Sequence, residues 1–213
     1  SDLGEEMKEV IGEETNFKLL GNMYRGARIV TATKEMHTPE DMKGFKLRAP
    51  NLDVYLKTWQ YLDAAPMPLA MSEVYTALQQ KTVEGQENPI SDSYNYAFQE
   101  VCNYWIKTNH VYSANVFIMD RNYYNSLPED IQAAVIEASD YASDQMNSLM
   151  LEREAQTEAQ LIEDGCEVIE VDTQEFIDYF KDFTDTYYPE LADWANRIKA
   201  MDPMLEDSGA HAA

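Results

Sequence analysis

Two arginines are the side chains whose type and spacing best indicate binding chemistry. Arg28 follows Gly26 in a segment that predicts a strand, and Arg48 ends another predicted strand twenty positions later. A guanidinium can bind a carboxylate through two parallel hydrogen bonds, and ligands of α/β proteins commonly bind at strand ends. The pair therefore indicates a carboxylate site. A surface or salt-bridge role is the alternative for each arginine.

An asparagine near the second arginine offers a neutral donor. Asn88 stands directly before Pro89, which biases the asparagine backbone towards the extended region. Its amide could donate a hydrogen bond to a ligand oxygen. From the residues alone, a turn-capping role is the better interpretation of Asn88.

Residues 43–89 must position these side chains. In the segment FKLR, Phe45 and Leu47 share one face of a strand, whereas Lys46 and Arg48 share the other. A helix capped by Asn51 follows, and then come a short extended run, a helix capped by residue 72 and a strand broken at residue 85. This alternation predicts an α/β fold.

The remaining chain predicts more strands and one long helix. Extended segments are predicted at residues 16–23, 27–32, 103–112 and 113–120 and in CEVIEV. Helices are predicted at 2–15, 37–41 and 128–164, and further helices are predicted to begin after residue 89 and at residues 172 and 189. The helix over 128–164 would be about 55 Å long, which exceeds the diameter of a domain of this size. We therefore expect it to bend or to span two lobes, and we expect disorder after Pro203.

Composition excludes several classes of partner. The 45% apolar content and 14 tyrosines of this 213-residue chain indicate a folded protein. Its 16 basic and 39 acidic residues give a net charge of −23, which repels nucleic acids and anionic membranes. We therefore expect no nucleic-acid partner. The opening SDLGEEMKEV has no signal-peptide pattern, and no segment is long and apolar enough to span a membrane.

The sequence carries no recognisable catalytic or cofactor motif. It lacks GxSxG, HExxH, a P-loop and a dinucleotide fingerprint, so we expect no cofactor and no metal site. His37 and His211 have no partners at metal-ligand spacing and are interpreted as surface residues. Cys102 and Cys166 allow at most one disulfide, and two unpaired, semi-buried thiols are favoured over a bridge.

Several segments resemble one protein family along most of the chain. In order, they are GARIVT, TPEDMKGFKLRAPN, AAPMPLAMSEVYTALQQKTVEGQENP, TNH and LPEDIQ. Together they resemble the DctP-type solute-binding proteins of TRAP transporters. The resemblance implies a periplasmic-binding-protein-like α/β fold, with two lobes joined by crossing strands and a long helix. It also implies a periplasmic receptor that binds a small organic acid and delivers it to TRAP-type membrane permease subunits.

The resemblance also implies roles for individual residues. Arg48, in KLRxP, corresponds to the arginine that forms the principal salt bridge to the ligand carboxylate. Arg28 corresponds to a second arginine, and Asn88 to the asparagine of ENP.

Three further residues complete the implied site. Asn51 follows the proline of LRxP, and Met71, before SEVY, corresponds to a position that packs on the ligand. His110, in TNH, corresponds to a histidine of a supporting hydrogen-bond network. Taken alone, a single histidine is more often a satisfied structural residue.

This chain departs from the family pattern most clearly at its beginning. The family has much of its first lobe before the segment that matches NFKLLGNM, and this chain has none of it. We therefore expect residues 1–25 and 114–153 to be a remnant of the first lobe and 26–113 and 154–203 to form the second lobe. A disordered tail is expected over 204–213. Two smaller departures are Asp63, where glycine is usual, and VEGQ in place of VDGQ.

Two other functions compete with the receptor. A hydrolase or lyase on an α/β scaffold would need two convergent carboxylates, and no such pair occurs at the predicted strand ends. A self-associating interaction fragment, packing through the long helix, is the second alternative. We expect a binding protein rather than an enzyme.

Overall fold

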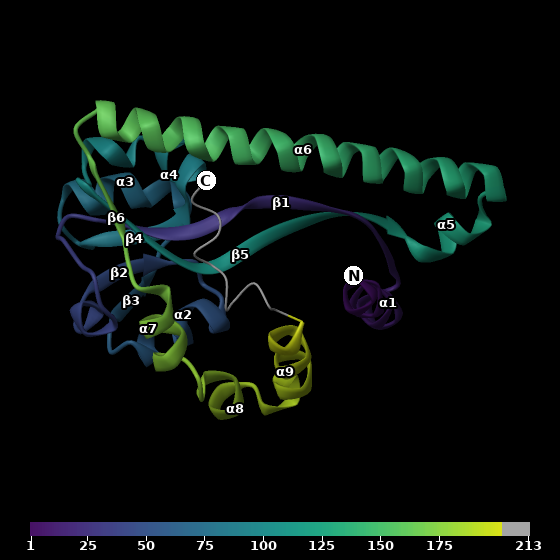
Figure 1. Ribbon diagram of the computed structural model, residues 1–213, viewed down its shortest axis with the longest axis horizontal. Coiled ribbons are helices and arrows are strands. Elements are labelled where there is room, and N and C mark those ends of the chain that lie inside the picture. Colours follow the sequence, from purple (N-terminus) through teal and green to yellow (C-terminus); the bar gives the residue numbers. More distant parts are fainter. Residues whose placement is uncertain (202–213) are drawn as a thin grey trace.

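The computed structural model describes residues 1–201 and contains one mixed sheet flanked by helices (Figure 1). The strands are β1 (Phe17–Ala32), β2 (Lys46–Ala49), β3 (Ala65–Pro68), β4 (Gly85–Pro89), β5 (Tyr104–Asp120) and β6 (Glu167–Glu170). The α-helices are α1 (Asp2–Thr15), α2 (Asp53–Tyr61), α3 (Met71–Gln79), α4 (Ile90–Asn95), α5 (Arg121–Ser126), α6 (Glu129–Glu163), α7 (Thr173–Tyr179), α8 (Phe183–Tyr187) and α9 (Ala192–Ala200). Short 3-10 helices occupy Pro39–Met42, Phe98–Glu100 and Pro189–Leu191.

The sheet has the strand order β3-β2-β4-β1-β5-β6. Strand β1 runs antiparallel to both of its neighbours, β4 and β5. Strand β2 is parallel to β3 and β4, and β6 is parallel to β5. The α/β prediction is therefore confirmed. This order also brings the predicted arginine strands close together, because only β4 separates β1 from β2.

Two long strands form the spine of the molecule. Strand β1 has 16 residues and β5 has 17, and they pair from Phe17 opposite Asp120 to Ala32 opposite Tyr104. The prediction of two strands separated by a turn at Gly26 was wrong, whereas the two adjoining extended segments predicted over 103–120 form one strand. Gly26, at φ 116°, does not turn the chain back but lies in one of three irregularities of the ladder, and the strand continues.

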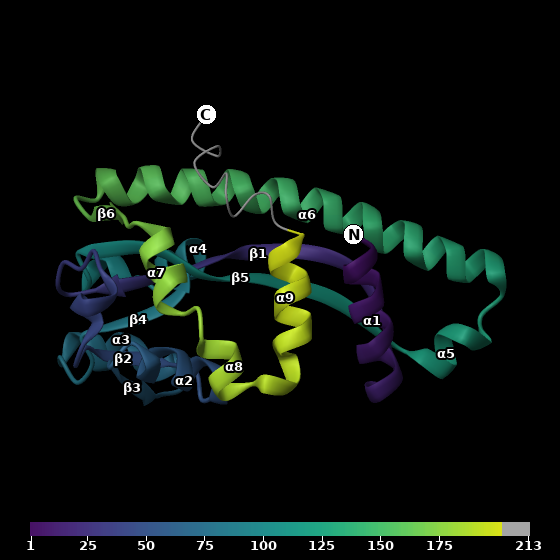
Figure 2. The same cartoon turned by 60° about the horizontal axis from the view of Figure 1, so that its bottom comes forward.

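Helix α6 lies along these two strands (Figures 1 and 2). Its 35 residues correspond to about 52 Å. The predicted long helix is thus confirmed, although Pro128 is its N-cap residue rather than its first helical residue. Strands β1 and β5 and helix α6 all extend beyond the small strands that flank them.

The core consists of two clusters, one on each face of the sheet. Alternate residues of one strand enter different clusters: Val30 lies in the first and Ile29 in the second, and Ile106 and Trp105 divide likewise. The first cluster includes Phe45 and side chains of α2 and α7, and the second includes side chains of α3 and α6. Every member lies within 26–113 or 154–203.

Within residues 1–25 and 114–153, Leu3, Leu20 and Tyr124 are buried, but twelve other large apolar side chains are exposed. They are Val10, Ile11, Phe17, Phe117, Ile118, Tyr123, Ile131, Ile136, Tyr141, Met146, Leu149 and Leu151. The division into two lobes stays a prediction.

Two predicted helix caps were wrong. Helix α2 begins at Asp53 with Leu52 as its N-cap residue, because the Leu52 N–H turns back to the Pro50 carbonyl at 2.8 Å and carries Asn51 out of the capping position. Helix α3 already begins at Met71, and Glu73 Oε2 accepts the Ala70 N–H at 3.1 Å.

Three smaller predictions can be compared with the structure. Cys102 and Cys166 are both unpaired and buried, which agrees with the prediction of free thiols. Among the helices within residues 1–201, none has the length and apolar character needed to cross a membrane. The predicted disordered tail lies outside the described residues.

Candidate ligand-binding site

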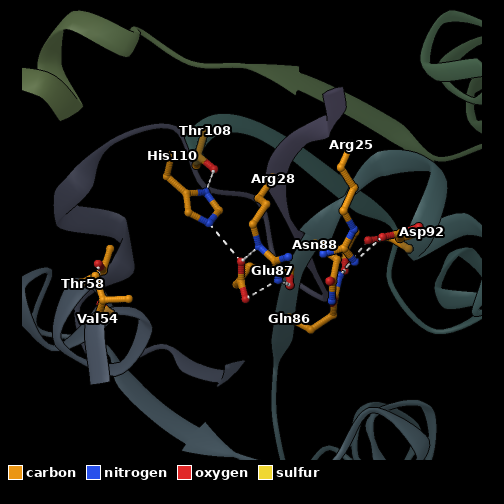
Figure 3. Close-up of polar contacts among 12 residues, drawn as sticks. Arg25, Arg28, Val54, Thr58, Gln86, Glu87, Asn88, Asp92, Thr108 and His110 are labelled. Atoms are coloured by element: carbon orange, nitrogen blue, oxygen red, sulfur yellow. Dashed lines mark hydrogen bonds and ion pairs between the residues drawn. The ribbon is translucent and has the colours of Figure 1, made fainter. Parts of the chain in front are cut away.

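Arg28 and Glu87 form a buried ion pair between neighbouring strands (Figure 3). Arg28 Nε donates to Glu87 Oε2 at 2.5 Å, and Nη2 donates to Oε1 at 2.8 Å and to the Glu87 carbonyl at 2.9 Å. Arg28 is 4% exposed and Glu87 is fully buried. The antiparallel register of β1 and β4 sets this pair, because it places Arg28 opposite Pro89 and Val30 opposite Glu87. The Tyr55 ring lies 5.1 Å from the guanidinium and adds a cation–π contact.

His110 is the second partner of Glu87. Its Nε2 lies 3.1 Å from Glu87 Oε2, and its Nδ1 lies 2.8 Å from Thr108 Oγ1 (Figure 3). The Trp59 ring packs edge-on against the imidazole, with ring centroids 5.0 Å apart. His110 therefore contacts the carboxylate that binds Arg28, which agrees with the supporting network implied by the resemblance.

The ion pair stabilises the charged forms of both partners. Burial acts to raise the pKa of Glu87, but hydrogen bonds from His110 and Arg28 outweigh it and hold this pKa below its ordinary value. Burial likewise acts to lower the pKa of Arg28, and Glu87 reverses the effect. Glu87 is therefore an anion at neutral pH, and it cancels the charge of Arg28.

Arg48 has a different environment. Strand β2 lies beside β4 with Arg48 aligned on Gln86. Its Nε and Nη2 donate to one acceptor, the Leu69 carbonyl, at 2.9 and 2.8 Å. Although Arg48 is only 6% exposed, no carboxylate of residues 1–201 forms an ion pair with it. Burial lowers the pKa of this guanidinium; Glu87 partly opposes that effect, and Arg28 adds to it.

Asn88 belongs to a buried chain of amides and hydroxyls. Its Nδ2 donates to Gln86 Oε1 at 2.7 Å, and Gln86 Nε2 donates to Thr31 Oγ1 at 2.7 Å and to Ser93 Oγ at 3.0 Å. Met71 Sδ lies 3.8 Å from the same Asn88 nitrogen. Strand β4 is buried at all five positions, so Asn88 has a fixed orientation.

The structure brings five of the six predicted site residues into one region. Arg28, Asn88 and His110 are linked through β4, Arg48 is aligned on the same strand, and Met71 contacts Asn88. Asn51 is exposed in the bend between β2 and α2, and no hydrogen bond within the described chain joins it to the other five.

Sequence reasoning missed two polar groups beside the predicted residues. Glu87 was not predicted as a site residue, although it stands between Gln86 and Asn88 in GQENP. An acid in a buried strand requires a cation as its partner, so its presence there was the signal that could have identified it. Arg25 was also missed. Its Nη2 donates to Asp92 Oδ2 at 2.8 Å (Figure 3).

One family model matches most of the chain. The profile of the family described as "DctP: Bacterial extracellular solute-binding protein, family 7" matches residues 1–193. The chain belongs to the DctP family. It thus shares the periplasmic-binding-protein type of α/β fold that the resemblance implied.

A curated relative shows how much of a family member this DctP chain represents. A solute-binding protein of Roseobacter denitrificans is 34% identical over 175 residues, which cover 82% of this chain and 54% of that protein. The chain therefore spans about half the length of the relative. The name of this relative describes a solute-binding protein.

Two solved structures share the fold of this DctP chain. A TRAP periplasmic solute-binding protein of Roseobacter denitrificans with bound L-galactonate has a TM-score of 0.80 and 31% identity. One from Sulfitobacter sp. with bound β-D-galacturonate has a TM-score of 0.82 and 26% identity. Each match covers 92% of this chain and 66% of the solved chain. Both bound molecules are acid sugars.

Proposed function

We propose that this chain is part of an extracytoplasmic receptor that binds a small sugar acid through Arg48. The observation that carries the proposal is that Arg48 is a buried guanidinium with no carboxylate partner among residues 1–201. Two of its N–H groups are held by the Leu69 carbonyl, so its direction is fixed. A buried cation without a counterion is unfavourable, and a ligand carboxylate would supply the missing charge.

The charges around Arg48 favour a ligand with one negative charge. Arg28 is already neutralised by Glu87, so it offers no second free cation to a dianion. Sugar acids carry one carboxylate and several hydroxyl groups. The bound L-galactonate and β-D-galacturonate of the two solved relatives support this class of ligand.

The other predicted residues receive supporting roles in this proposal. Asn88 orients the ligand through its amide oxygen, because the two N–H groups of its Nδ2 are directed at Gln86 Oε1 and Met71 Sδ. Met71 packs on the ligand beside Asn88, and Asn51 contributes from the bend after β2. Arg28 and His110 set the position and charge of Glu87, so they act on the ligand through the network.

The proposal also includes the location and the partner. We propose that the receptor works in the periplasm and delivers its ligand to a TRAP-type permease by closing around it. The description of the family as extracellular solute-binding proteins supports the location. The alternative of a self-associating fragment stays a prediction of the sequence alone.

Calorimetric titration tests the role of Arg48. The complete gene product is titrated with L-galactonate, β-D-galacturonate and a C4-dicarboxylate, and the Arg48→Ala and Arg121→Ala variants are compared with it. Arg121 is a matched control because it pairs with Glu9 at 2.9 Å and contacts none of the site residues. We expect the sugar acids to bind and the signal to disappear only in Arg48→Ala. Equal binding by Arg48→Ala and Arg121→Ala would contradict the proposal.

A further inference from the structure

One edge of β1 has a helix, rather than a strand, as its neighbour. Strand β4 pairs with β1 only over residues 28–32, so within residues 1–201 no strand pairs with that edge before Arg28. The ladder to β5 is irregular in the same stretch, between Leu20 and Met23 and between Tyr24 and Gly26. Backbone N–H groups here need other acceptors, because unpaired buried donors are costly.

Side chains of α6 supply those acceptors. Ser143 Oγ accepts the Asn22 N–H at 3.0 Å. Asn147 Oδ1 accepts the Tyr24 N–H at 2.6 Å, and its Nδ2 donates to the Asn22 carbonyl at 3.3 Å. Positions 143, 147 and 154 lie on one face of the helix, so the same stripe continues to Glu154.

Glu154 ends this stripe beside the ligand site. Its Oε1 accepts the Ala27 N–H at 3.3 Å and the Tyr24 hydroxyl at 3.2 Å, while the Tyr24 hydroxyl oxygen also accepts the Ala27 N–H at 2.8 Å. A Cβ on Gly26 would lie 2.8 Å from Glu154 Oε1 and 3.0 Å from Pro89 Cβ. The carboxylate is thus packed against the backbone between Arg28 and the strand end that carries Asn88.

The surroundings of Glu154 contain both signs of charge. Tyr24 faces it from β1 and Lys107 from β5, and Glu158 is its neighbour on α6. Lys107 forms ion pairs with two other acids: its Nζ lies 3.2 Å from a Glu158 oxygen and 2.5 Å from a Glu170 oxygen. No cation forms a direct ion pair with Glu154 in the described chain, so its main partners are the Ala27 N–H and the Tyr24 hydroxyl.

We propose that Glu154 is a positioning residue for the ligand site. It fixes the β1 irregularity at Gly26, and through it the register of Arg28 against Glu87 and the packing of Pro89 next to Asn88. Helix α6 thereby holds the binding strands from a distance. The expected effect of Glu154 on ligand binding rests on the proposed sugar-acid function. The effect of Glu154 on the position of Arg28 can be measured without ligand.

The test compares three variants of the complete gene product. Glu154→Ala removes the acceptor, and Glu154→Gln keeps an acceptor oxygen without the charge. Glu152→Ala is the control, because Glu152 lies on the same helix but accepts only from Gln156 within the described residues. We expect Glu154→Ala to weaken β-D-galacturonate binding about tenfold, Glu154→Gln to restore most of it, and Glu152→Ala to leave it unchanged.

A ligand-free measurement separates this inference from the proposed function. NMR follows the Arg28 Nε–H and the Asn88 side-chain amide in the three variants. We expect both signals to move in Glu154→Ala and to return in Glu154→Gln. If the signals of Glu154→Ala are the same as those of Glu152→Ala, the positioning role is overturned, whether or not any sugar acid binds. If the unmodified protein binds no sugar acid but the NMR signals move in Glu154→Ala as expected, only the proposed function is contradicted.

Discussion

Arg28 and Glu87 face each other as two forks across neighbouring antiparallel strands, with N···O distances of 2.5 and 2.8 Å. Both side chains are shielded from solvent, and His110 completes the hydrogen bonding of the acid. The pair sets the charge of the site, because it leaves Arg48 as the cation without a carboxylate among the described residues. The following predictions depend on this arrangement.

Glu87→Gln should destabilise the protein strongly. The change leaves Arg28 buried without its counterion, and breaking a buried pair from one side costs about 3–5 kcal/mol. The free energy of unfolding, measured with urea, checks this value. Glu9→Gln is the control, because its pairs with Lys18 and Arg121 are partly exposed and should contribute less than about 1 kcal/mol. Similar losses in the two variants would refute the assignment.

The contribution of Glu87 should disappear in acid. Its folded-state pKa lies below the ordinary value of 4.5, so the unfolded chain takes up a proton first as pH falls. The stabilisation is therefore present above pH 4.5 and is lost as pH falls through the depressed folded-state pKa. Urea unfolding of the unmodified protein and Glu87→Gln at several pH values measures this difference. A gap that stays constant down to pH 3 would contradict the prediction.

Glu154 should show the opposite dependence on pH. Burial raises its pKa, against hydrogen bonds from Tyr24 and Ala27 that act to lower it. The folded state then favours the protonated acid, so stability from this group is present at low pH and lost as pH rises above 4.5. We expect Glu154→Gln to match or exceed the unmodified protein in unfolding free energy at pH 7 and to lose any advantage near pH 4. If the unfolding free energy of Glu154→Gln, relative to that of the unmodified protein, is lower at pH 7 than at pH 4, the predicted direction of the pKa shift is wrong.

Gly26→Ala should be more harmful than the same change at Gly165. Both glycines have positive φ, at 116° and 85°, but only at Gly26 would the new Cβ meet atoms closer than 3.4 Å. The backbone strain, about 1–3 kcal/mol, applies to both, and the clash with Glu154 and Pro89 adds to it at Gly26 alone. Thermal unfolding and sugar-acid affinity are compared for the two variants. We expect affinity to fall only in Gly26→Ala, and equal affinities would argue against a role for this site.

The local sequence predicted the elements that carry the site better than the pairing between them. Arg48 at the end of a short strand, and the long helix, follow from residue type and spacing. Glu87 could not be predicted in this way, because its partners are 59 and 23 positions away and are brought together only by the pairing of β1 with β4 and β5.

Two mistakes have a related physical cause. Gly26 is compatible with a turn and with a strand irregularity, and contacts from α6 decide between them. Asn51 is a good N-cap residue by type, yet the backbone bond from Leu52 to Pro50 shifts the helix start beyond it. In each case a hydrogen bond that residue type does not specify determined the outcome.

The length of β1 and β5 has a mechanical consequence. Both strands continue beside α6 without a connecting loop, although their pairing is irregular at three points, so no loop along them offers a pivot. A change of shape on ligand capture would have to be spread as gentle torsion and flexure over all three elements, as in a leaf spring. Such a spring opposes bending at every residue. Its elastic recoil would return the protein to the ligand-free shape once the ligand has left.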